Sequence, residues 1–237
     1  MRTSNVWGEA SYGHMHLDGT TPTDSAGFTL GADGKVSSAA RLGFAAGYSG
    51  TRGKGMQAGT ASGFLYGMYV YKSWAFTGSA GYLFTKFDLK DQDVKLDAHS
   101  GAADAYVNYD FGGGFTGVGG ARYFQTHTKK TKMYQFDDVS ATTLVGGLKF
   151  SAQGKHFGVH ADINAVYDVH ADKSDYRIKR NGDIIKENGS RLHRAGGEAG
   201  IGASYTRGAW TIDADYFAQV RKDFADQSVM LKINYAF

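Results

Sequence analysis

The chain has 237 residues with 34 glycines, one proline and no cysteine, and its formal net charge is +3 at pH 7. The lack of cysteine excludes a disulfide scaffold, a thiolate metal site and a cysteine nucleophile, and the small net charge gives no support for a nucleic-acid partner. Hydrophobic residues at 42% and aromatic residues at 14% argue against disorder, and no stretch is apolar enough for a transmembrane helix or a signal peptide.

Apolar and polar residues alternate with a period of two along almost the whole chain, which is the pattern of β-strands with two different faces. In chain order, this alternation predicts twelve strands, near residues 5–16, 26–34, 40–50, 61–72, 74–88, 98–110, 114–127, 140–152, 156–170, 192–206, 209–222 and 227–237. Most of these runs exceed the usual strand length of about 5–6 residues and match the span of about 9–11 residues that a tilted membrane-crossing strand needs.

The connectors between these segments alternate in length. Short connectors near residues 72–74, 110–114, 152–155 and 206–208 alternate with long polar ones near 17–25, 50–60, 90–98, 128–139 and 171–191. Short turns on one side and long loops on the other are typical of outer-membrane barrels. We therefore predict an all-β fold, a twelve-stranded antiparallel transmembrane β-barrel with short periplasmic turns and long extracellular loops. A soluble sandwich or lipocalin-like barrel is the alternative, and the strand length disfavours it.

The longest connector, 171–191, has strand-like segments of its own at 176–179 and 184–187. Between them lies Asn181-Gly182, a pair that favours a tight hairpin turn because both central residues need positive φ. We expect a hairpin here, in which the ninth and tenth strands project past the membrane.

The two faces of the predicted strands differ in chemistry, and in a membrane barrel the polar face lines the interior. The expected pore lining comprises Glu9, Arg41, Asp104, Arg122, Lys149, His160, Asp162, Arg194, Glu198, Asp213, Asp215 and Lys232. Aromatic side chains near the strand ends are expected to form two girdles, with Trp7, Trp74 and Trp210 beside short turns or a terminus and Tyr48, Phe84 and Tyr167 toward the long loops. Twelve strands enclose a narrow hydrophilic pore, wide enough for one polypeptide segment.

Three stretches resemble a known family over essentially the whole chain. They are 6–12, 41–49, and the closing segments 197–200, 210–216 and 227–237. Together they resemble the C-terminal translocator domain of bacterial autotransporters, the type V secretion proteins. The resemblance implies an outer-membrane barrel that anchors and exports its own N-terminal passenger domain through or beside the pore, with both barrel ends periplasmic. Family members carry a helical linker inside the pore, so residues 1–5 are expected to be a residual linker or tag and residues 6–237 the translocator domain.

The resemblance also implies assembly by the BAM machinery, which reads the last strand as a signal. The matching residues here are Val229, Leu231, Ile233, Tyr235 and Phe237. Other expected partners are outer-membrane lipid and lipopolysaccharide. The phosphate groups of lipopolysaccharide are expected to bind basic residues of the longest loop, together with Lys129, Lys130 and Lys132. No nucleic acid is expected.

No catalytic residue, metal or cofactor is predicted. Some relatives cleave their passenger inside the pore with the help of barrel carboxylates, but the scissile segment is absent from this sequence. A self-contained outer-membrane enzyme of the phospholipase or omptin type remains an alternative, since His127 and Asp137-Asp138 flank one long loop, and so does a porin or adhesin barrel. The glycines of 112–117 match a dinucleotide fingerprint, but they lie in an expected turn with no helix after it.

Overall fold

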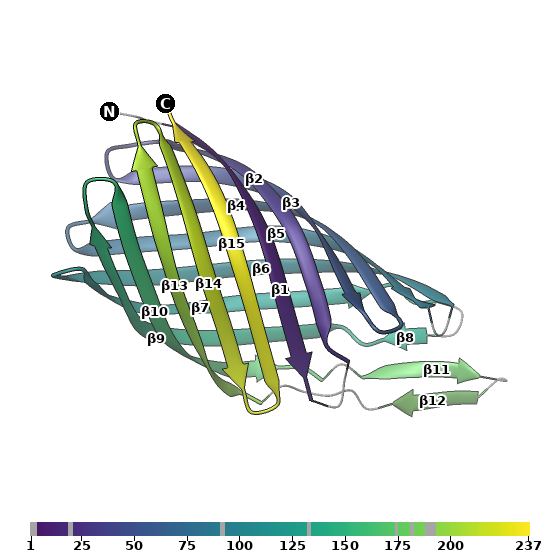
Figure 1. Ribbon diagram of the computed structural model, residues 1–237. Helices are drawn as coiled ribbons and strands as arrows, with labels where there is room; N and C mark the ends of the chain where they lie inside the picture. The colour runs from purple at the N-terminus through teal and green to yellow at the C-terminus, as the bar shows by residue number, and fades with distance from the viewer. Residues whose placement is uncertain are drawn as a thin grey trace.

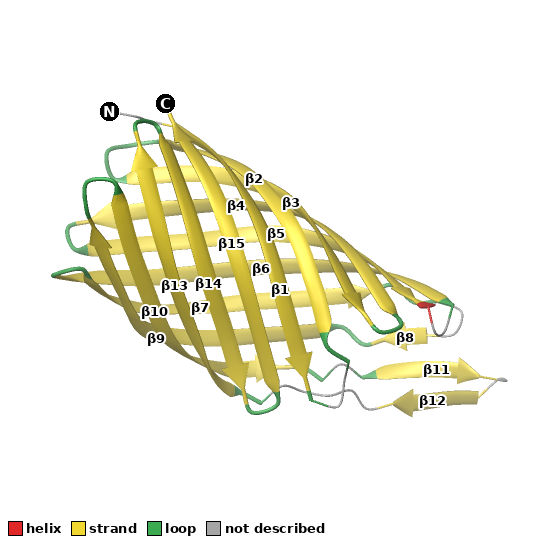
Figure 2. Cartoon of the chain, in the orientation of Figure 1, coloured by secondary structure: helices red, strands yellow, loops and turns green. Residues whose placement is uncertain are grey.

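The computed structural model describes residues 4–18, 21–90, 93–131, 134–173, 175–180, 183–187 and 193–237, and almost all of them belong to strands (Figure 2). The barrel strands are β1 (Ser4–Leu17), β2 (Thr23–Lys35), β3 (Ala40–Gly53), β4 (Met56–Tyr71), β5 (Trp74–Leu89), β6 (Val94–Gly112), β7 (Phe115–Thr128), β9 (Val139–Gln153), β10 (Phe157–Ala171), β13 (Ala195–Arg207), β14 (Trp210–Arg221) and β15 (Phe224–Ala236). No helix among the described residues has the length and apolar character that crossing a membrane requires.

The twelve strands close into one antiparallel barrel, in the order β1-β15-β14-β13-β10-β9-β7-β6-β5-β4-β3-β2. The closing pair is long: β1 runs against β15 from Asn5 opposite Ala236 to Leu17 opposite Phe224. The two chain ends lie side by side at one end of the barrel (Figure 1). The predicted fold class is therefore confirmed.

The strands extend further than the sequence pattern predicts, mostly at the end away from the termini. β4 begins at Met56 and β6 at Val94, so two of the connectors expected to be long are short. Only residues 54–55 join β3 to β4, and residues 90–93 join β5 to β6. Individual strands have from 12 residues in β14 to 19 in β6, more than enough to cross the hydrocarbon core.

Three further strands form a small separate sheet in the order β12-β11-β8. They are β8 (Tyr134–Phe136), β11 (Tyr176–Arg180) and β12 (Asp183–Glu187), and Figure 1 shows them at the end of the barrel opposite the termini. The pairing of β11 with β12 confirms the predicted hairpin, although Asn181 and Gly182 lie outside the described residues. The hairpin is not a projection of the ninth and tenth strands, because it pairs with β8 instead of continuing β10 and β13.

The barrel wall has its apolar side outward. On β15, Val229, Leu231 and Ile233 are 49%, 50% and 44% exposed, whereas Met230 and Lys232 between them turn to the interior. Few hydrophobic side chains of the described residues are buried: Ala45, Val94, Leu96, Ala98, Val145 and Val166. A water-soluble barrel would bury its apolar side, so this wall is built for an apolar surrounding.

Candidate functional site

The interior of the barrel gathers the polar side chains that the sequence alternation selects. Strand parity turns inward Glu9, Arg41, Asp104, Arg122, Lys149, His160, Asp162, Glu198, Asp213, Asp215 and Lys232. Arg194 is different, because β13 begins at Ala195 and Arg194 precedes it as an exposed residue. Its side chain is therefore not at a lining position of a strand, and its carbonyl accepts from the backbone N–H of Asp168 at 2.9 Å and from Nη1 of Arg221 at 3.3 Å.

An ion pair spans the interior between strands that are not neighbours. Arg122 on β7 donates from Nη1 to Oε1 of Glu198 on β13 at 2.5 Å and from Nη2 to Oε2 at 2.8 Å. Its Nε donates to the hydroxyl of Tyr106. Glu198 is only 2% exposed. Because β9 and β10 separate the two strands, the guanidinium reaches over them, and this bidentate pair narrows the lumen there.

A second buried ion pair joins two residues that the sequence prediction did not select. Arg221 on β14 donates to Asp168 on β10, with Nη1 2.5 Å from Oδ2 and Nη2 3.2 Å from Oδ1. Both side chains are 6% exposed. Thr143 also donates to Asp168, at 2.7 Å, and the carbonyl of His193 accepts from Arg221 at 3.0 Å. The alternation of the sequence places both residues on the inward face of their strands. Nothing in the local sequence around either residue predicts that they pair with each other.

Trp7 lies inside the barrel, so its predicted place in the outer girdle is wrong. Its Nε1 donates to the hydroxyl of Tyr66 at 2.8 Å, and Nζ of Lys232 lies 4.3 Å from its ring centroid. A Cβ at Gly31 would overlap the ring. The physical reason is parity: Trp7 alternates in phase with Glu9, and the outward residue at this end of β1 is its neighbour.

Asp33 connects this Trp7 cluster to the neighbouring strands. Its carboxylate accepts from Nδ2 of Asn5 at 3.2 Å, from the hydroxyl of Tyr66 at 3.1 Å and from Nη1 of Arg41. These donors come from β1, β4 and β3. The interior near the chain ends is therefore tied together across four strands by one carboxylate that the sequence prediction omitted.

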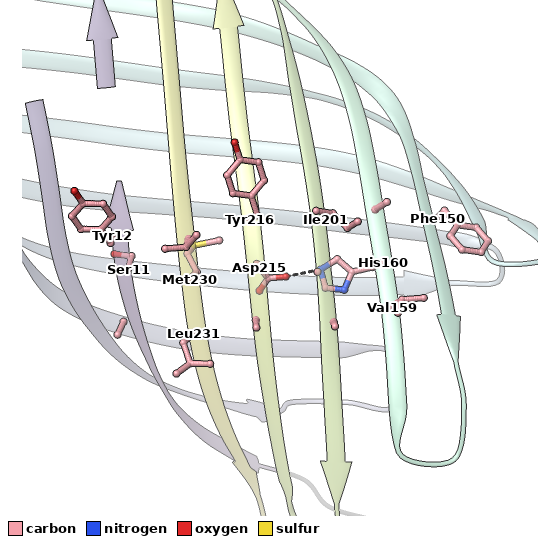
Figure 3. A pocket seen from close by; sticks show the side chains of 16 residues that line it. Ser11, Tyr12, Phe150, Val159, His160, Ile201, Asp215, Tyr216, Met230 and Leu231 are labelled. Atoms are coloured by element: carbon pink, nitrogen blue, oxygen red, sulfur yellow. Dashed lines mark hydrogen bonds and ion pairs between the residues drawn. The ribbon is translucent and has the colours of Figure 1, made fainter. Parts of the chain in front are cut away.

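His160 on β10 and Asp215 on β14 meet over β13, with 2.7 Å between Nε2 and Oδ1 (Figure 3). Gly202 on β13 lies beneath them, and a Cβ there would overlap both side chains. Asp162 accepts from Nδ2 of Asn164 at 2.9 Å. His160, Asp162 and Asp215 border a hollow of about 450 Å³. No group of His, Cys, Asp and Glu within the described ranges could hold a metal ion.

The outer face carries the remaining aromatic residues that were expected in the girdles. Trp74, Trp210, Tyr48 and Tyr167 are 42%, 54%, 51% and 48% exposed, and Phe84 packs against His99 at 5.1 Å between ring centroids. The proposed signal residues of β15 also point outward. A hollow of about 880 Å³ extends across β1, β15, β14, β13, β10 and β9, and its lining includes Val159, Ile201 and Leu231 (Figure 3).

A Ser–His–Asp cluster lies at the barrel rim, where an outer-membrane hydrolase would need one. Oγ of Ser140 is 3.1 Å from Nε2 of His170 and 2.7 Å from Oδ2 of Asp172. Oδ1 of Asp172 approaches the same Nε2, at 3.3 Å. A catalytic triad needs the carboxylate on the other ring nitrogen, so that the serine hydroxyl donates to a free Nε2. Here the serine hydroxyl donates its hydrogen bond to the carboxylate, and the cluster joins the start of β9 to the loop after β10 as a loop clamp.

Histidines near the barrel rim form separate ion pairs. His14 and His16 share one face of β1, and His14 pairs with Asp24 at 2.8 Å while His16 pairs with Asp18 at 3.4 Å. His127 pairs with Asp138 at 2.6 Å. The glycines at 112–114 have φ of +80°, +64° and +87° in the turn from β6 to β7. Positive φ explains the glycines there.

Solved structures with the same fold include autotransporter domains. The translocator domain of NalP from Neisseria meningitidis matches with a TM-score of 0.72 and 15% identity, over 100% of this chain and 89% of that one. The β domain of the Bordetella autotransporter BrkA matches with a TM-score of 0.64 and 13% identity, over 99% of this chain and 100% of that one.

A barrel of another kind is also similar. The Pseudomonas putida toluene transporter TodX matches with a TM-score of 0.59 and 12% identity, over 99% of this chain and 89% of that one. No protein-family model and no curated protein matches the sequence. At these identities the likeness establishes the fold: a closed antiparallel β-barrel shared with autotransporter domains and a transporter.

Proposed function

We propose that this protein is an outer-membrane anchor and translocation passage for an N-terminal passenger, as in type V secretion. The observation that carries the proposal is a closed barrel with an apolar outer wall, a charged interior and both chain ends at one mouth. An apolar exterior suits lipid, and a closed barrel satisfies every backbone group of its wall. A hydrophilic interior suits a polypeptide segment, whose peptide groups need polar surroundings.

The position of the chain ends sets the direction of transport in this proposal. Both chain ends lie at one mouth, and the two longest connectors, 129–138 and 172–194, lie at the other. In barrels of this type the longer loops are extracellular, so the mouth with the chain ends is the periplasmic one. A passenger attached before β1 would enter there and leave at the mouth near β11 and β12. The barrel itself performs no bond chemistry in this scheme.

The last strand is proposed as the signal for the assembly machinery. Val229, Leu231, Ile233, Tyr235 and Phe237 form an uninterrupted outward stripe along the seam that closes on β1. The strand that carries such a signal must also complete the barrel, and β15 does so through its pairing with β1 and β14.

Lipopolysaccharide is a proposed lipid partner at the opposite mouth. Lys129 lies just beyond β7, with its Nζ 3.9 Å from Asp97, and Lys130 follows it as an exposed residue. Phosphate groups would form charge-assisted contacts with these ammonium groups. Lys132, the third residue of this prediction, lies outside the described residues.

Transport of an apolar compound, suggested by the likeness to a toluene transporter, is the less favoured function. An aromatic hydrocarbon in this interior would have to displace water from ionised groups such as Arg122, Asp162 and Asp215, which costs free energy without any compensating contact. A polypeptide or hydrated ions can instead hydrogen-bond to the same side chains.

The proposal is tested by fusing a reporter domain with a signal peptide before Ser4 and expressing it in a Gram-negative host. We expect the reporter to become accessible to protease on intact cells. A Phe237→Ser variant should lower the amount of folded barrel in the outer membrane and, in proportion, the exposed reporter. A folded barrel whose reporter remains in the periplasm would overturn the translocator function.

A further inference from the structure

The charges inside the barrel do not balance. Among the described residues of the barrel strands, the inward carboxylates are Glu9, Asp33, Asp104, Asp162, Asp168, Glu198, Asp213, Asp215 and Asp226, and the inward cations are Arg41, Arg122, Lys149, Arg221 and Lys232. Lys35 and Asp110 share the inward parity but lie exposed beside the turns at the end of the barrel that holds the chain termini. The carboxylates clearly outnumber the cations, although the whole chain has a formal net charge of +3. The positive excess of the chain therefore lies on the outer face, the turns and the loops, and the interior is anionic.

The inward arginines are already neutralised. Arg41 is paired with Asp33, Arg122 with Glu198 and Arg221 with Asp168, each within hydrogen-bond distance. Lys232 stacks on the ring of Trp7 and lies opposite Asp213 in the strand register. Lys149 lies opposite Asp162 in the strand register and borders the same hollow of the interior. Each of these five cations therefore has a carboxylate beside it, and the remaining inward carboxylates are not matched by a cation.

Three carboxylates are bound instead by side chains other than arginine and lysine. Asp104 accepts from the hydroxyl of Ser79, Asp162 from the amide of Asn164, and Asp215 pairs with the imidazole of His160. A hydroxyl or amide donor orients a carboxylate and leaves its negative charge in place. Asp162 and Asp215 both border the 450 Å³ hollow of the interior.

An unused acceptor lies beside them. Asn164 is 8% exposed, and its Oδ1 has no hydrogen-bond partner. The oxygen lies over the lumenal side of Gly147, at the place where a Cβ of that glycine would be. An unsatisfied buried acceptor costs free energy. This carbonyl oxygen is therefore available to bind a cation directly or through one of the waters of a hydrated cation.

We propose that the passage is selective for cations over anions, and that Asp104, Asp162 and Asp215 determine this selectivity. This inference rests on the proposed function as a hydrophilic passage, and it specifies the sign of the charge on the ions or polypeptide segments that pass most easily. Walls of low dielectric constant focus the field of lining charges into the lumen, and acidic side chains select cations in other channels by the same effect. Segments rich in lysine and arginine would be favoured in the same way.

The test uses the purified barrel in planar bilayers at pH 8, with a tenfold KCl gradient near 0.1 M. From the reversal potential we expect K⁺ to be favoured over Cl⁻ about three- to tenfold, the size that potentials of one to several kT produce. The triple variant Asp104→Asn/Asp162→Asn/Asp215→Asn should bring this ratio close to one. Asp24→Asn, which removes an exposed carboxylate from the outward face of β2, should leave it unchanged.

A second measurement keeps the proposal testable if the triple variant does not fold. In the wild-type barrel the K⁺ preference should shrink when the salt is raised to 1 M, because the screening length falls from about 10 Å to about 3 Å. A conducting barrel with no preference, or a preference for Cl⁻, overturns the selectivity and leaves the proposed passage intact. A folded barrel that conducts no ions overturns both.

Discussion

The two halves of the barrel interior are filled in different ways. In the half formed by β1–β5, aromatic rings lie over glycines of neighbouring strands: Trp7 over Gly31 and Phe64 over Gly81. Small and hydroxyl residues occupy most of the other inward positions there. In the half formed by β7–β15, long charged side chains bridge strands in pairs such as Arg221 with Asp168.

Both halves depend on glycine for room, but the contacts differ in kind. Gly31 makes space for a ring, and Gly202 makes space for the pair of His160 and Asp215. Glycine weakens a strand and permits close approach. The ring contacts are dispersion and apolar burial, which salt does not screen. The charged contacts depend on desolvation and geometry, so losing one partner is costly.

The largest effect should follow from breaking the buried ion pair between Arg221 and Asp168, in the half formed by β7–β15. Arg221→Met leaves Asp168 buried without its partner, and we expect the free energy of unfolding to fall by about 3–5 kcal/mol. Urea unfolding of the barrel in detergent micelles measures the change. Lys129→Met is the matched control: its partner is Asp97 at 3.9 Å, both side chains are well exposed, and a surface pair contributes at most about 1 kcal/mol.

The double variant Arg221→Met/Asp168→Leu sharpens this test. Replacing both charges with apolar side chains removes the unpaired ion, so much of the lost stability should return. Equal losses in Arg221→Met and Lys129→Met would contradict the view that burial sets the strength of the pair.

A smaller effect should follow from filling a glycine in the half formed by β1–β5. Gly31→Ala puts a Cβ into the ring of Trp7, and we expect a loss of about 1–3 kcal/mol from overpacking. In a Trp74→Phe/Trp210→Phe background, the fluorescence of Trp7 should also change. Gly63→Ala is the control, because its Cβ would meet nothing within 4 Å. Equal effects of the two alanines would contradict the ring-over-glycine contact.

Sequence alternation was sufficient to predict the fold, because each barrel strand has one apolar face that points outward and one polar face that points inward. It failed at the strand ends away from the termini, where the barrel extends beyond the expected strands. At 94–98 the pattern is reversed, since Val94, Leu96 and Ala98 point inward and are buried. The outward apolar residues of a strand stop where the apolar surroundings stop. The strand itself can continue further through its backbone hydrogen bonds, so the alternation pattern underestimates its length.

Parity found most inward residues, but it could not find their partners. Arg122 and Glu198 are 76 residues apart and meet because of the tilt and register of the closed barrel, which no local window contains. Trp7 was misplaced because its residue type and its position near a strand end outweighed its parity. Arg194 was misplaced because the predicted start of its strand, at 192, was too early.

The smallest predicted effect lies outside both halves, in the loop after β10, and tests whether that loop clamp depends on charge. The hydroxyl and the backbone N–H of Ser140 donate to the carboxylate of Asp172, and these bonds hold the pKa of Asp172 below its ordinary value. A lowered pKa contributes stability that is present above the unfolded-state pKa of about 3.9 and is lost as the pH falls through the lowered value. Asp172→Asn should therefore be less stable than wild type at pH 7, and the difference should vanish only in acid. Urea midpoints from pH 7 to pH 2 measure this difference in stability.

Ser140→Ala removes the strongest donor to Asp172, so in this variant the part of the stability that is lost in acid should be smaller. If the difference between Asp172→Asn and wild type instead stays constant down to pH 2, the clamp acts through shape and not through the charge of Asp172.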